Sequence, residues 1–297
     1  MSVSEKQILV TKASGEKVPF ATKKLRQSLE RSGADQKIID EVVEELRPYL
    51  RNGISTKLIY KYAFDILRKV SRPHAARYKL KQAIMELGPS GYPFEKFISE
   101  VLKSQGFSVQ VGVIVEGHCV KHEVDVVAEK GDQHFMVECK FHNMSGIKCD
   151  VKIPLYIQAR FQDVEKHWLT MPGHGTKFHQ GWLVTNTKFT SDAIQYGTCA
   201  GLHMLGWDYP IKGSLNELID NSGLHPITSI STLTKAEKQF LLEKKIVLCK
   251  EICSQPNLLD ALEITPGRKE RILKEGRELC LQSNHQITSS DSENGSK

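Results

Sequence analysis

The feature that most limits the fold is a change of hydrophobic period near residue 107. Before it, apolar residues from Phe94 to Leu102 recur every three or four positions, which predicts an amphipathic helix. After it, every second residue is apolar in three runs, VQVGVIVEG, HEVDVVAEK and HFMVECKFH, which predicts three strands with a tight turn at 130–132. A helix around 155–168, a strand GWLVTN, a second helix and a strand HMLGW follow. This order predicts an α/β sandwich built on a mixed sheet.

Charged residues lie inside two of these apolar runs. Asp125 stands within a run of valines, and Glu138 and Lys140 lie two positions apart in the next run. Because strand side chains alternate between faces, Glu138 and Lys140 project together, and a tight hairpin can bring Asp125 close to Glu138. A charge in a core strand is costly unless it is paired or binds a metal ion. The cluster is therefore either a Mg²⁺ site for phosphodiester cleavage or a buried Lys140–Asp125 salt bridge without catalysis.

A longer set of segments resembles a known family. GYPFEKFISEVLKSQGF, HEVDVVAE, MVECKFH and GWLVTNTKFTSDAIQYGTCAGLHMLGWD occur in this order over about residues 90–210. Together they resemble the Mrr-like branch of the PD-(D/E)xK restriction-endonuclease fold. The resemblance implies a DNA endonuclease that uses Mg²⁺, or Mn²⁺ in its place. The alternative is a nucleotide-responsive DNA-binding protein or regulator that retains the fold without catalysis.

The same resemblance implies roles for individual residues. The carboxylates of Asp125 and Glu138 would bind the metal ion, together with the main-chain carbonyl of Cys139. Lys140 would be the catalytic lysine. An accessory glutamate on the preceding helix would be Glu95, with Glu100 as the weaker candidate, and Gln158 would be a polar residue on the later helix. Because one such centre cuts one strand, a double-strand break favours a homodimer or a higher homo-oligomer.

The first third of the chain has a different organisation. Residues 8–20 predict a hairpin around Ser14 and Gly15, and helical spacing of apolar residues follows, with Ser55 where a helix begins. Residues 1–90 hold 18 lysines and arginines against 10 aspartates and glutamates, whereas the whole chain has a net charge of +6. This surplus suits a polyanion, nucleotide or nucleic acid, or else it is a solvated lysine-rich surface.

The segments VTKASGEKVPFATKKLRQSL and GISTKLIY resemble the ATP-cone, a nucleotide-sensing module, over about residues 8–87. The resemblance implies ATP or dATP as a regulatory ligand, contacted by Lys12, by the loop from Val18 to Lys24 and by Thr56. Phe20 in this loop either lines the base pocket or packs the hairpin onto the helices. Because the chain has no GxxxxGK[ST] phosphate loop, we expect binding without hydrolysis. The alternative is a basic helical domain that binds DNA directly.

These patterns predict four segments in the chain. They are an ATP-cone at 1–89, a nuclease domain at 90–215, a helical region at 216–280 and a disordered tail at 281–297, with a linker at 89–93. Within the helical region, LLDALEITPGRKERILKE has a weak helix-hairpin-helix character that could offer backbone N–H groups to DNA phosphates. An ordinary helical cap on the nuclease domain is the alternative.

Other classes of protein do not fit the composition. There is no apolar run of membrane-spanning length and no secretory signal pattern, so we expect a cytoplasmic protein that does not bind membranes. The 7 cysteines are scattered without a CxxC pair, which disfavours a disulfide framework or a zinc ribbon. The histidines do not have the spacing of metal ligands; those considered are His118, His122, His134, His142, His174, His179 and His203.

Overall fold

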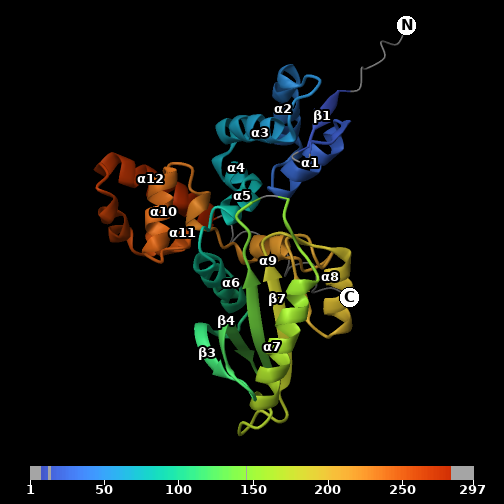
Figure 1. Ribbon diagram of the computed structural model, residues 1–297. Coiled ribbons are helices and arrows are strands. Elements are labelled where there is room, and N and C mark those ends of the chain that lie inside the picture. The colour runs from blue at the N-terminus through green and yellow to red at the C-terminus, as the bar shows by residue number, and fades with distance from the viewer. Residues whose placement is uncertain (1–7, 13–14, 145, 282–297) are drawn as a thin grey trace, which may run out of the picture. The chain divides into compact units, whose positions relative to one another are not determined.

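The computed structural model describes residues 8–12, 15–144 and 146–281 (Figure 1). The chain divides into two compact units, which are described separately: residues 1–80 with 229–232, and residues 81–228 with 233–297. Ser14 of the predicted turn and residues 282–297 of the predicted tail lie outside the described residues. No helix in the described part of the chain is both long and apolar enough to span a membrane.

The first unit is a short hairpin followed by helices. Its elements are β1 (Leu9–Thr11), β2 (Lys17–Pro19), α1 (Thr22–Arg31), α2 (Gln36–Leu46), the 3-10 helix η1 (Arg47–Tyr49), α3 (Thr56–Val70) and α4 (Arg72–Tyr78). Ser55 caps α3 by accepting a hydrogen bond from the Leu58 amide at 3.2 Å, as a helix start requires. The Thr11 amide donates to the Ile54 carbonyl at 2.9 Å, which ties the hairpin to the loop before α3.

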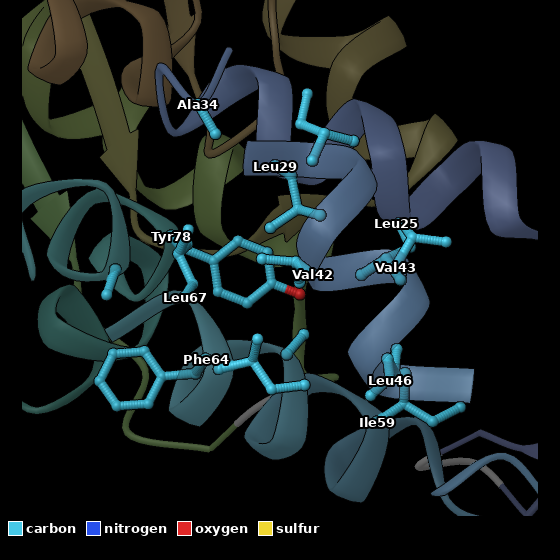
Figure 2. Close-up of a cluster of buried hydrophobic side chains, with 14 of the residues drawn as sticks. Leu25, Leu29, Ala34, Val42, Val43, Leu46, Ile59, Phe64, Leu67 and Tyr78 are labelled. Carbon is cyan, nitrogen blue, oxygen red and sulfur yellow. The ribbon is translucent and has the colours of Figure 1, made fainter. Parts of the chain in front are cut away.

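The core of the first unit is a cluster of side chains from its four α-helices (Figure 2). Leu29 of α1, Val42 of α2 and Leu67 of α3 are fully buried, and Tyr78 of α4 points in among them. Each helix contributes the apolar positions of its three- and four-residue spacing, which is the spacing that forms one helix face. This packing fixes the starts of α1 and α3 relative to the hairpin.

The second unit is built on a five-stranded mixed sheet, and this confirms the fold predicted from the sequence. The strands are β3 (Ser108–Glu116), β4 (Lys121–Lys130), β5 (Gln133–Lys140), β7 (Phe178–Thr185) and β9 (His203–Leu205), side by side in that order. β3, β4 and β5 are antiparallel neighbours, and β5, β7 and β9 run parallel. A separate two-stranded parallel sheet is formed by β6 (Lys148–Cys149) and β8 (Lys188–Phe189).

Helices cover both faces of this sheet. The main ones are α6 (Tyr92–Ser104), α7 (Lys152–Trp168), α8 (Ser191–Cys199) and α9 (Leu215–Ser222), and Figure 1 shows α7 running along the strands. Phe135 of β5 contacts Phe107, which follows α6, whereas Met136 packs with Phe161 of α7. Because neighbouring strand residues point to opposite faces, α6 and α7 cover opposite sides of β5.

The C-terminal helices are fastened to α6. They are η2 (Ile227–Ser229), α10 (Lys235–Glu243), α11 (Cys249–Ser254), η3 (Pro256–Leu262) and α12 (Pro266–Leu281). Lys96 on α6 pairs with Glu251 on α11 at 2.8 Å. Arg268, in the segment predicted to have helix-hairpin-helix character, donates to both carboxylate oxygens of Glu237 at 2.6 and 2.7 Å. Its guanidinium thus joins α12 to α10.

The boundary between the units lies before the predicted linker at 89–93. Residues 81–88, with most of α5 (Leu80–Met85), belong to the second unit. The buried Thr228 hydroxyl donates to the Ala83 carbonyl at 2.7 Å, and a Cβ on Gly88 would lie 2.7 Å from the Phe141 ring. Tyr92 of the predicted linker is already the first residue of α6.

Candidate active site and candidate nucleotide pocket

The candidate active site lies where β4 and β5 separate. The two strands are paired from Lys130 and Gln133 as far as Val126 and Val137. Beyond this pair of residues, the Cys139 amide of β5 donates a hydrogen bond to Oδ2 of the Asp125 side chain at 2.7 Å. This bond holds Asp125 beside the end of β5.

Glu138 is the most buried carboxylate at this point, with 6 % of the residue exposed. Its Oε2 accepts a hydrogen bond from Arg160 of α7 at 2.6 Å, while its buried Oε1 has no partner among the described residues. Burial, together with the negative charge of Asp125, raises the pKa of Glu138 to about 8, against the opposing effect of Arg160. Burial also raises the pKa of Asp125, although the Cys139 amide opposes it.

Glu95, in the first turn of α6, belongs to the same group of carboxylates. Burial raises its pKa to about 7, with further contributions from the charges of Asp125 and Glu123. Its Oε1 lies only 2.7 Å from the place where a Cβ on Gly91 would be, so the side chain folds back over the start of its own helix. Glu100 is placed differently, because its carboxylate is bound by lysines of α6 and α11.

Lys140 is the last residue of β5, two positions beyond Glu138, and it is exposed. The buried Thr185 hydroxyl donates to the Lys140 carbonyl at 2.7 Å and fixes the backbone at this position. The alternative interpretation of this cluster requires an ion pair between Lys140 and Asp125. The described residues show no such ion pair. Burial raises the pKa of the Cys139 thiol far above its usual value, which leaves this group protonated and unreactive.

This group of side chains suits a divalent cation. The negative charge of Asp125 raises the pKa of both Glu95 and Glu138, and among the described residues one guanidinium, that of Arg160, pairs with an oxygen of this group. The unpartnered, buried Oε1 of Glu138 is a hard oxygen ligand of the kind that Mg²⁺ and Mn²⁺ bind. A bound cation would remove the cost of ionising these buried groups together.

The four residues expected to contact a nucleotide line one pocket of about 430 Å³ in the first unit, a volume in the range of small-molecule sites. Lys12 follows β1, Phe20 and Lys24 flank the start of α1, and Thr56 is the first residue of α3. The N-termini of two helices therefore border the same space, and both carry partial positive charge suited to phosphate.

The wall of the pocket is partly aromatic. The rings of Tyr60 and Tyr78 stack at 4.5 Å, and the Tyr60 hydroxyl donates to the Tyr78 carbonyl. Phe20 lines the pocket and also packs against the helical core, so both of its predicted roles are compatible with its position. The Lys12 ammonium, at the rim, pairs with Glu16 at 2.7 Å, where both side chains are exposed.

Comparison with known proteins gives matches to three family models. Residues 88–205 match the family model described as restriction endonuclease, residues 8–84 match the ATP cone domain, and residues 225–280 match the model AF1548-like, C-terminal. An uncharacterized protein of Archaeoglobus fulgidus is 39 % identical over 157 residues, which are 53 % of this chain and 84 % of that protein.

This chain belongs to the Mrr-like restriction-endonuclease family. A solved structure of a protein of unknown function, AF1548, is also similar, with 34 % identity and a TM-score of 0.53 over 64 % of this chain and 98 % of that one. The Mrr-like domain is preceded in this chain by an ATP-cone and followed by the AF1548-like C-terminal region.

Sequence reasoning did not predict Arg160 in this Mrr-like centre. Besides its bond to Glu138, its guanidinium donates to the Glu123 carbonyl and lies 5.5 Å from the centre of the Tyr156 ring. It therefore joins α7 to β5 and to the separating part of β4. The i, i+4 spacing of Tyr156 and Arg160 was visible, but nothing in the sequence pairs residue 160 with residue 138. Gln158, also on α7, has a buried Oε1 without a partner among the described residues.

Proposed function

We propose that this protein is an endonuclease that hydrolyses phosphodiester bonds of DNA with Mg²⁺, or Mn²⁺ in its place. The observation that supports this most is the meeting of Asp125, Glu138 and Glu95 at the separation of β4 and β5, with too little positive charge to compensate them. One buried oxygen of Glu138 has no partner among the described residues, and a bound cation would supply the partner that this oxygen lacks.

Each residue has a distinct task in this proposal. Asp125, the free oxygen of Glu138 and the Cys139 carbonyl would hold the cation, which supplies a more acidic bound water and charge to stabilise the transition state. Lys140, exposed beside this position, orients the attacking water or neutralises charge on the scissile phosphate. Glu95, with its pKa near 7, accepts a proton or holds a second cation. Arg160 is a positioning residue, because it acts through Glu138.

A cleavage assay on supercoiled, linear, single-stranded, branched and methylated DNA tests this proposal. We expect cleavage by the wild type with Mg²⁺, none with EDTA, and a loss of about 10²–10⁴-fold in Asp125→Asn and Lys140→Ala. Lys166→Ala, an exposed lysine near the end of α7, is the matched control and should cleave normally. Equal cleavage by wild type and Lys140→Ala would contradict the assignment. DNA binding without cleavage under every condition would favour the non-catalytic alternative.

We further propose that the first unit binds ATP or dATP without hydrolysis and thereby controls cleavage. The support is the pocket, in which two lysines, two helix N-termini and aromatic rings surround a space of nucleotide size. A nucleotide changes activity only if it binds two states of the protein with different affinity. Calorimetry should show binding that Lys12→Ala weakens and that Lys61→Ala, an exposed lysine of α3, does not. If no adenine nucleotide binds at millimolar concentration, this assignment fails.

The active form is proposed to be a homodimer or a higher homo-oligomer, because one centre cuts one strand. Light scattering with and without nucleotide measures the mass of the species in solution. A monomer that only nicks duplex DNA, with and without nucleotide, would contradict this part of the proposal.

A further inference from the structure

Three histidines of the second unit converge at the opposite end of β5 from Glu138. His134 is the second residue of β5, and its register partner on the parallel strand β7 is His179. His174 lies in the loop that joins α7 to β7. One ring nitrogen of each histidine lies within 4.8 Å of a ring nitrogen of each of the other two. Residues from three parts of the chain thus present imidazoles to one point.

The same nitrogen is unsatisfied in all three rings. Nδ1 of His134, of His174 and of His179 is buried and has no hydrogen-bond partner among the described residues. The side chain of His134 is only 4 % exposed, so bulk solvent has little access to this ring. Three buried nitrogens that lack partners at one place are unusual, because buried polar atoms are nearly always hydrogen-bonded.

The other ring nitrogen, Nε2, already has a hydrogen-bond partner in two of the three histidines. Nε2 of His134 lies 3.2 Å from Oε1 of Glu129, and Nε2 of His179 lies 3.1 Å from the His174 carbonyl. Both partners are acceptors, so each Nε2 carries the proton and each Nδ1 has a free lone pair. A carboxylate or a carbonyl behind the imidazole is the usual support of a metal-binding histidine.

We propose that His134, His174 and His179 bind one transition-metal ion of the Zn²⁺ type, with a fourth position open to water. Three imidazoles with an open position are a known zinc donor set, and imidazole favours Zn²⁺, Co²⁺, Ni²⁺ or Cu²⁺ over Mg²⁺. The ring of Trp168, at the end of α7, covers the site. Its centre lies 3.8 Å from the centre of the His134 ring and 5.4 Å from that of His179. Lys177 is held by Glu129 at 3.2 Å, so its charge is partly compensated.

This site is separate from the carboxylate centre. His134 and Glu138 are four positions apart on β5, which is about 13 Å along a strand. The two centres also differ in ligand chemistry, imidazole nitrogen at one and carboxylate oxygen at the other. The ion would fasten the loop of His174 to the sheet and thus stabilise the folded state in proportion to its affinity. The inference therefore does not depend on whether the protein cleaves DNA.

Metal content and Co²⁺ spectroscopy test the proposal. The full chain is stripped with a chelator and titrated with Zn²⁺ or Co²⁺ in excess Mg²⁺, in the wild type, His174→Ala, His118→Ala and Asp125→Asn with Glu138→Gln. His174 is half-buried in a loop, so its variant should fold, and His118 is an exposed control. Circular dichroism confirms folding of every variant.

We expect one Zn²⁺ per chain, visible absorption of tetrahedral Co²⁺ and a metal-dependent rise in Tm in all variants except His174→Ala. In that variant the affinity should fall by at least about tenfold, as loss of a ligand requires. Equal Zn²⁺ binding by wild type and His174→Ala would overturn the proposal. Loss of Zn²⁺ in the carboxylate variant alone would also overturn it, because it would assign the ion to the other centre.

Discussion

The two ends of β5 hold buried polar residues on the same face, but burial affects the charge of these residues differently at each end. At one end Glu138 meets Asp125 and Glu95, which carry the same charge, and burial raises their pKa values. At the other end His134 meets two further imidazoles, and burial, opposed by Glu129, lowers its pKa to about 4. Like charges collect at the first end, whereas the second end avoids charge.

This difference separates the two proposed cation sites. A group of carboxylates repels itself when ionised, so it is stable only when protonated or when a cation is bound. Neutral imidazoles tolerate burial, and they lose only the hydrogen bonds of their unpartnered nitrogens. The carboxylate end should therefore respond strongly to hard cations, and the histidine end to borderline ones.

The largest expected effect is an opposite pH dependence of the two ends in metal-stripped protein. The pKa of Glu138 is about 8 in the folded state against an ordinary value of 4.5, so its stabilising contribution is lost as pH rises from 4.5 to 8. The pKa of His134 is lowered from 6.5 to about 4, so its contribution is lost as pH falls through that interval. Of these two groups, only Glu138 changes the free energy of unfolding between pH 6.5 and 8.

Urea unfolding at a series of pH values measures this difference. Glu138→Gln should remove a decline of about 3 kcal/mol between pH 6 and 9, and Mg²⁺ should remove part of it in the wild type. His134→Gln should leave that decline intact and change only the acid side. Identical pH profiles for wild type and Glu138→Gln would show that the carboxylate end is not strained.

The second prediction removes the compensating charge of the carboxylate end. In Arg160→Met the Glu138 carboxylate is buried without a partner, and we expect a loss of about 2 kcal/mol in the free energy of unfolding at pH 9. The loss should shrink at pH 6, where Glu138 is protonated. Adding Glu138→Gln to Arg160→Met should restore stability, and a double-mutant cycle measures the coupling. Equal losses at pH 6 and pH 9 would mean that Arg160 acts through packing alone.

The sequence predicted the carboxylate end better than the histidine end, for a physical reason. Charges within apolar strands are visible in one segment, and the tight turn at 130–132 determines that Asp125 approaches Glu138. His134 and His179 are 45 positions apart, and they meet only because β5 and β7 are parallel neighbours in one register. Neither register nor strand order can be obtained from the spacing of histidines.

Helix rotation is the other quantity that the sequence left open. Glu95 and Glu100 are five positions apart on α6 and thus lie on different sides of the helix, but only packing decides which side meets β4. The same is true of Arg160 on α7. In the first unit, Lys12 and Thr56 converge because the Thr11 amide bonds the loop before α3, a contact across 43 positions.

The third prediction concerns the support of the histidine end. Glu129 accepts from Nε2 of His134, and Glu129→Gln removes the negative charge behind this ring while keeping its shape. We expect Zn²⁺ affinity to fall by about tenfold, as for other residues that support metal ligands. Cleavage with Mg²⁺ should not change, because Glu129 lies at the other end of the sheet from Glu138. An unchanged Zn²⁺ affinity would leave Glu129 without a role at that end.

The smallest expected effect comes from a single methyl group at the carboxylate end. Gly91 has φ −73°, which alanine adopts easily, but a Cβ would lie 2.7 Å from Oε1 of Glu95. Gly91→Ala should therefore displace this carboxylate without unfolding the start of α6 and lower the cleavage rate by about threefold to tenfold, against unchanged stability. Gly267→Ala, where nothing lies within 4 Å of an added Cβ, is the matched control. Because the clash is with Glu95 alone, adding Gly91→Ala to Glu95→Gln should lower the rate little further, and a full second loss would show that Gly91 matters for another reason.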